Sequence, residues 1–95
     1  MVMKIIWREH ADIRYAERFA LYDITKDEIE QEIEKQLVKI SEGYDKYYKS
    51  EKFKTIFKVR GKMATVEKAE RGKEIYIITL WQSSEAEIEL WKKKL

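Results

Sequence analysis

The spacing of the apolar residues changes near Gly43, and this change limits the folds open to the chain. Between residues 9 and 40 the apolar side chains recur every three or four positions, which is the period of an amphipathic helix. From residue 52 to residue 81 they alternate with polar side chains, which is the period of a half-buried strand. Helices with one apolar face need an apolar surface to cover, and a sheet provides it, so the pattern predicts an α+β fold. With 95 residues, we expect a single domain over 1–95.

The first half of the chain predicts one strand and two helices. The short run Met3–Trp7 is apolar and contains β-branched residues, which favour a strand. Residues 9–22 carry one apolar stripe and predict the first helix. Thr25 and Glu28 form a capping box that starts the second helix, whose stripe continues to Ile40. These two helices form a hairpin.

The second half predicts a sheet followed by a helix. Three segments share the strand alternation: 53–60, 63–70 and 74–81. Residues 44–50 are either a loop or a fourth strand. The short links at Gly61 and Gly72 predict hairpins, so the sheet is expected to be antiparallel with three to four strands. Ser84 and Glu87 form a second capping box, which opens a C-terminal helix.

The composition excludes several kinds of site. The chain has no cysteine and a single histidine, so disulfides and thiolate or multi-histidine metal sites are excluded. No Gly-rich phosphate loop or serine nucleophile elbow is present, and we expect neither a metal nor a cofactor. The longest apolar run is far shorter than a membrane span, and no secretion signal opens the chain, so we expect a cytoplasmic protein that binds no membrane. The absence of asparagine and the 40% of charged residues are typical of thermophilic proteins.

A net charge of +2 conceals an uneven distribution. Residues 1–42 carry seven basic and ten acidic groups, residues 43–73 carry ten and four, and residues 74–95 carry three and four. The three parts therefore have charges of −3, +6 and −1. A basic segment between acidic flanks is typical of a surface that binds a polyanion.

The strongest candidate surface is the predicted strand from residue 52 to 62. Its odd positions are mostly apolar, whereas five of its six even positions are cationic: Lys52, Lys54, Lys58, Arg60 and Lys62. Alternate residues of a strand lie about 6.6–6.8 Å apart on one face, which is close to the phosphate spacing of a nucleic-acid strand. Tyr47, between Tyr44 and Tyr48, lies just upstream and could stack on unpaired bases. The alternative is a solvated lysine face that discourages pairing of sheet edges.

A second candidate site is the set His10, Arg14 and Arg18, which share one side of the first helix. Between two guanidinium groups a neutral histidine would lose proton affinity and could act as a base. The alternative is structural: the arginines pair with carboxylates such as Glu17, and His10 packs near a helix end.

These residues also carry a resemblance to a known family. The sequence His10-Ala11-x-x-Arg14-x-x-x-Arg18, followed by Ile24-Thr25-x-x-Glu28-Ile29 and the strand Ile77–Trp81, resembles small uncharacterised prokaryotic domains. Those domains are usually grouped with the RelE/ParE-like toxin superfamily, and the resemblance covers roughly residues 4–81.

The resemblance implies a RelE-like fold whose sheet faces RNA. It also implies an endoribonuclease that needs no metal. In such enzymes basic residues and a tyrosine help the ribose 2′-hydroxyl attack its own phosphate. It implies His10, Arg14 and Arg18 as the catalytic residues, RNA (including mRNA on the ribosome) as the substrate, and an antitoxin protein as a partner. The chain departs from the family at residues 20–23, which are extra and lengthen the first helix. ParE-like relatives do not cleave RNA.

A different class of function also fits the sequence. The basic surface would then meet an acidic protein surface, or the acidic second helix of another copy, in a non-catalytic homo-oligomer. Trp81 would anchor such an interface.

Overall fold

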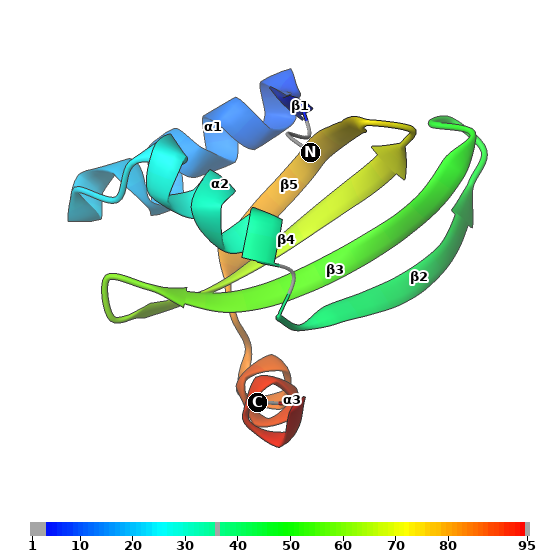
Figure 1. Ribbon diagram of the computed structural model, residues 1–95. Helices are drawn as coiled ribbons and strands as arrows, with labels where there is room; N and C mark the ends of the chain where they lie inside the picture. The colour runs from blue at the N-terminus through cyan, green and yellow to red at the C-terminus, as the bar shows by residue number, and fades with distance from the viewer. Residues whose placement is uncertain (1–3, 36, 95) are drawn as a thin grey trace.

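The computed structural model describes residues 4–35 and 37–94, which form a five-stranded mixed sheet and three α-helices (Figure 1). The elements follow one another as β1 (Lys4–Trp7), α1 (Glu9–Arg18), a 3-10 turn (Ala20–Tyr22), α2 (Lys26–Lys35), β2 (Lys39–Asp45), β3 (Ser50–Val59), β4 (Lys62–Arg71), β5 (Glu74–Gln82) and α3 (Glu85–Lys94). The strands lie in the order β1-β5-β4-β3-β2. None of these helices is long and apolar enough to cross a membrane.

The prediction of a three- to four-stranded antiparallel sheet is wrong. β1 joins the sheet and pairs in parallel with β5, with Ile5 beside Ile75 and Trp7 beside Ile77. The other pairs in the sheet are antiparallel. A parallel partner needs a long crossover, and here α1, α2 and the three following strands supply it. The result is a mixed sheet rather than an antiparallel one.

The second helix was also predicted to be too long. It ends at Lys35; of the residues expected to continue its stripe, Leu37 lies in an exposed bend and Ile40 enters the edge strand β2. The carbonyl of Val38 accepts hydrogen bonds from the Thr55 hydroxyl at 2.8 Å and from the Ile56 amide at 3.2 Å. Pairing with β3 therefore overrides the helical spacing, and the β-branched Val38 and Ile40 favour an extended backbone.

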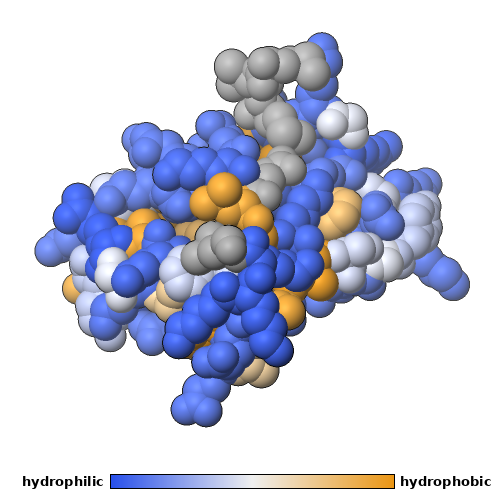
Figure 2. Space-filling model, turned by 60° about the horizontal axis from the view of Figure 1, so that its bottom comes forward, coloured by the Kyte–Doolittle hydropathy of each residue, from blue (hydrophilic) through white to orange (hydrophobic). Residues whose placement is uncertain are grey.

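The two faces of the sheet are covered differently. α1 and α2 lie on one face, and α3 lies on the other (Figure 1). The main core is formed between the first two helices and the sheet by Ala11, Phe19, Ile24, Ile29, Ile33, Phe57, Val59, Ala64, Val66, Ile75, Ile77 and Leu80. Hydrophilic side chains cover most of the α3 side, with smaller separate apolar areas between them (Figure 2).

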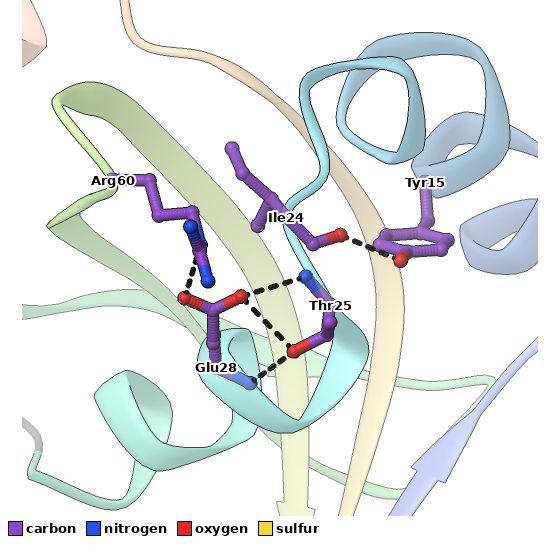
Figure 3. A network of polar contacts seen from close by, with 5 residues as sticks. All are labelled: Tyr15, Ile24, Thr25, Glu28 and Arg60. Atoms are coloured by element: carbon purple, nitrogen blue, oxygen red, sulfur yellow. Dashed lines mark hydrogen bonds and ion pairs between the residues drawn. The ribbon is translucent and has the colours of Figure 1, made fainter.

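The first capping box forms as predicted. The Thr25 hydroxyl accepts a hydrogen bond from the Glu28 amide at 3.2 Å, and the Glu28 carboxylate accepts one from the Thr25 amide at 3.0 Å. The Tyr15 hydroxyl donates to the carbonyl of Ile24 at 2.6 Å and holds α1 against the start of α2 (Figure 3). The second carboxylate oxygen of Glu28 binds Arg60 at 2.6 Å, which ties α2 to the β3–β4 hairpin.

A lysine with a fully buried side chain lies on the helix side of β4. The Lys68 ammonium group is 3.0 Å from the Glu70 carboxylate, whose other oxygen accepts a hydrogen bond from Lys39 at 2.9 Å. Burial lowers the pKa of Lys68. Burial also opposes the ionisation of Glu70, but Lys39 and Lys68 hold the pKa of Glu70 below its ordinary value. Glu70 is therefore the counterion on which this buried charge depends.

We expect Glu70→Gln to lower the free energy of unfolding by about 3 kcal/mol, because it leaves the buried Lys68 charge without its partner. Lys68→Met removes the charge itself and should cost much less, since Glu70 keeps Lys39. Urea denaturation followed by circular dichroism measures both variants. Equal losses in the two variants would contradict this role for Glu70.

Candidate nucleic-acid interface

The predicted basic strand lies on the face opposite α1 and α2, but most of its cations are already paired. Lys52 is 3.7 Å from Asp45 and 3.9 Å from Glu67. Lys54 is 3.2 Å from Glu87 of α3. These carboxylates come from three other elements, so no pattern within the strand could predict them.

The last two predicted cations, Arg60 and Lys62, do not lie on the sheet face that carries Lys52 and Lys54. Arg60 has a φ of 46° in the two-residue β3–β4 turn, and its guanidinium pairs with Glu28 of α2. The Lys62 ammonium group lies 4.2 Å from the centroid of the Tyr22 ring. Of the five predicted cations, Lys58 is the one that makes no ion pair or ring contact with a described residue. The five therefore do not form a continuous free basic track, and their binding role stays a prediction.

Carboxyl groups also interrupt this face. Burial raises the pKa of Glu67, and a hydrogen bond to Glu42 raises it further. Asp45 adds a third carboxyl group near Lys52. A polyanion following β3 would meet these groups before it reached Lys54.

The ion pair between Lys54 and Glu87 gives a stability prediction. Lys54→Gln should destabilise the protein by about 1–2 kcal/mol, since the Glu87 side chain is largely buried and loses its cation. Lys58→Gln, on the same strand face, should cost less than about 0.5 kcal/mol. Thermal unfolding at neutral pH compares the two variants.

The difference in stability between the wild type and Lys54→Gln should depend on pH. Burial opposes ionisation of Glu87, but hydrogen bonds from Ser84, Trp81 and Lys54 hold its pKa below the ordinary 4.5. Its stabilising contribution is therefore complete above 4.5 and is lost as the pH falls through the folded value. The gap between the wild type and Lys54→Gln should narrow below pH 4.5; a gap that widens there would contradict this assignment.

The structure does not bring His10, Arg14 and Arg18 into contact with one another. His10 is exposed at the first turn of α1, and Arg14 pairs with Glu17 at 3.0 Å. Arg18 donates to the carbonyl of Leu80 at 3.1 Å and so ties α1 to β5. Because α1 covers the helix face of the sheet, these residues lie on the side opposite the basic strand. Their catalytic role stays a prediction.

A different group of residues does come together, at the end of the sheet where the β2–β3 and β4–β5 turns lie (Figure 1). We call it the tyrosine cluster: Arg8, Tyr47, Tyr48 and Tyr76. The Tyr47 and Tyr48 rings are 4.9 Å apart and nearly perpendicular, and the Tyr48 and Tyr76 rings are 5.8 Å apart. Arg8 lies 5.9 Å from the centroid of the Tyr48 ring and donates to the Tyr47 hydroxyl at 3.5 Å.

Local geometry fixes these side chains. One oxygen of Asp45 accepts hydrogen bonds from the amides of Tyr47 at 2.8 Å and Tyr48 at 3.1 Å, which shapes the β2–β3 turn. The Tyr76 hydroxyl donates to Glu74 at 2.9 Å, and this bond raises the pKa of Tyr76. Tyr47 is 75% exposed, so one ring of the cluster faces solvent.

The cluster is surrounded by cations without carboxylate partners. The amide of Lys4 donates to the carbonyl of Lys73, which brings the start of β1 to the β4–β5 turn. Within the described part of the chain, no carboxylate lies at ion-pair distance from these basic residues of the two turns and β1: Lys4, Lys46, Lys49, Arg71 and Lys73. Free positive charge therefore gathers at this end of the sheet rather than along β3.

Sequence reasoning found part of this cluster. It selected Tyr47 and noted Tyr48, but it missed Arg8 and Tyr76. Arg8 is 39 residues from Tyr47, and only the parallel pairing of β1 with β5 brings them together. The alternation in β5 was the available signal for Tyr76, since Ile75 and Ile77 are core residues and the residue between them must point to the other face.

No protein-family model matches the sequence, and no curated protein is significantly similar to it. The resemblance to RelE/ParE-like toxins therefore stays a prediction. Among the residues that the structure describes, no group of three or more histidine, aspartate or glutamate side chains is arranged to hold a metal ion.

Proposed function

We propose that this protein binds single-stranded RNA through the tyrosine cluster. The observation that carries the proposal is the exposed Tyr47 ring beside Arg8, at the end of the sheet where cations lack carboxylate partners. Aromatic rings combined with unpaired basic side chains are typical of single-strand binding, since bases stack on the rings and phosphates meet the cations. The paired cations of β3 support this role less well.

Single-stranded rather than duplex nucleic acid suits the geometry. The exposed ring offers a face to an unstacked base, whereas the bases of a duplex are already stacked on one another. The five surrounding cations, four lysines and Arg71, lie on the two hairpin turns, the end of β4 and the start of β1, so they can follow a flexible backbone. We place the protein in the cytoplasm, where RNA is available to it.

We expect Tyr47→Ala to weaken binding of a labelled single-stranded RNA by roughly five- to hundredfold, because base stacking on an aromatic ring contributes about 1–3 kcal/mol. Fluorescence anisotropy measures the affinity. The matched control is Tyr44→Ala, which removes an exposed tyrosine on β2, outside the cluster, and should change affinity little. Affinity of the wild type should also fall steeply with salt.

Two outcomes would contradict the proposal. If Tyr47→Ala and Tyr44→Ala changed RNA affinity equally, the tyrosine cluster would not be the binding surface. Absence of RNA binding at low salt, in a chain that sediments as a discrete oligomer, would favour the protein-interaction module instead. The exposed Ile13 and Leu21, on α1 and the turn after it, would be candidates for such an interface.

Cleavage of the bound RNA is the further activity that the toxin resemblance implies, and an antitoxin would be its partner. In the cluster, a tyrosine hydroxyl and a guanidinium group lie together at Tyr47 and Arg8, which are the group types such chemistry uses. Tyr47→Phe separates the two activities: it keeps the ring for binding and removes the hydroxyl. Incubation of labelled RNA with ribosomes should show cleavage by the wild type and its loss in this variant.

A further inference from the structure

The helix α3 contacts the body of the protein through one buried charged residue and three half-buried apolar ones. Glu87 is its only buried side chain among those described, at 8% exposure. The apolar side chains Ile88, Leu90 and Trp91 are only half-buried. In Figure 1, α3 stands apart from the other helices, on the opposite face of the sheet.

Glu87 forms a compact polar network with two strands of the sheet and with the cap of its own helix. One carboxylate oxygen accepts hydrogen bonds from the Trp81 indole N–H at 3.0 Å and from the Ser84 amide at 2.8 Å. The other oxygen is 3.2 Å from the Lys54 ammonium group. A carboxylate therefore occupies the position between a cation and an aromatic ring.

The face beneath α3 again carries aromatic and cationic side chains, beyond the carboxyl group of Glu67 that separates it from the tyrosine cluster. Tyr76 of the cluster, Lys52, Lys54, Trp81 and Lys58 all lie on this face, as strand register and alternation show. Tyr76 and Trp81 belong to the same strand, with a bulge opposite Glu67 between them, so they are separated by about 15 Å. That distance corresponds to two or three nucleotides of an extended single strand, since alternate strand residues and successive phosphates have similar spacings of about 6–7 Å.

We propose that α3 is a displaceable cover, and that RNA bound at the tyrosine cluster extends over Lys54 and Trp81 by replacing the Glu87 carboxylate with a phosphate. A phosphate can accept the same charge-assisted hydrogen bonds, so the exchange keeps Lys54 paired. With α3 closed, the RNA site is confined to the end of the sheet. With α3 displaced, it includes the Lys54 and Trp81 surface. This inference rests on the proposed function, because it describes the regulation of the same RNA surface.

The test compares two RNA lengths and two charge-matched variants of the full chain. Glu87→Gln weakens a contact that holds α3, whereas Glu89→Gln removes an exposed carboxylate of the same helix whose only ion pair within the described residues is with Lys92. We expect Glu87→Gln to bind an RNA of about 12 nucleotides about tenfold more tightly than the wild type, because the open state becomes more populated. Glu89→Gln should stay within about twofold, and an RNA of about 4 nucleotides should bind all three proteins similarly.

Hydrogen exchange of the wild type provides a second measurement that does not depend on a variant. Saturation with the longer RNA should reduce the protection of the α3 amides, and the shorter RNA should leave it unchanged. Two results would contradict the role of α3 as a displaceable cover: unchanged or increased protection with the longer RNA, or equal affinities of Glu87→Gln and Glu89→Gln. Neither result would affect binding that depends on Tyr47. Failure of every protein to bind either RNA would overturn the proposed function, and this inference with it.

Discussion

The parallel pairing of β1 with β5 is the constraint on which the rest of the structure depends. It adds a fifth strand to the sheet, and the chain must then cross the sheet before β5 is formed. α1 follows β1 directly and packs across β5, where Ala11 allows a close approach and Arg18 binds the carbonyl of Leu80. The same pairing places Arg8, the residue after β1, beside tyrosines from the β2–β3 turn and from β5. The core and the candidate site therefore depend on one long-range contact, which forms only after loop closure over most of the chain.

The high content of charged residues explains why the basic strand is not a simple binding track. A buried or half-buried cation needs a counterion, and the chain has nearly as many carboxylates as cations, 18 against 20. In the fold, Lys52, Lys54 and Arg60 each find a carboxylate that lies on another element. Among the described residues, several cations without a carboxylate partner lie at or next to the β2–β3 and β4–β5 turns, whereas on β3 only Lys58 has neither an ion pair nor a ring contact. Local charge density in a sequence therefore overstates the free charge on the folded surface, and pairing in three dimensions decides which cations are available to a ligand.

The sequence predicted those features that depend on neighbouring residues. Both capping boxes, at Thr25 and Ser84, form as expected, because their partners lie three positions apart. The strand predicted over residues 53–60 is present in β3, where Thr55, Phe57 and Val59 of the odd positions are buried, as is Ile56. The predicted sheet was wrong, because neither β1 nor residues 39–45 show which strand they pair with. The same limit applies to the site: Tyr47 was predicted from its local context, whereas Arg8 and Tyr76 join it only through sheet topology. The partners of Lys54 and Arg60 likewise could not be read from the strand that contains them.

The attachment of α3 by a charged contact has a physical consequence that an apolar attachment would lack. A helix held by a fully buried apolar face leaves only if that face is exposed to water, at a cost of about 25 cal/mol per Å². A buried ion pair contributes little net stability, because the desolvation of both groups offsets their attraction. Its cost of separation falls further when an incoming anion replaces the carboxylate, since the cation is never left unpaired. The contacts that Glu87 makes with Trp81 and Lys54 of the sheet are ones that a phosphate can also make, whereas the apolar contacts of Ile88 or Trp91 are not. The Glu87 carboxylate that holds α3 on the sheet and the phosphate proposed to displace it are both anions that accept charge-assisted hydrogen bonds.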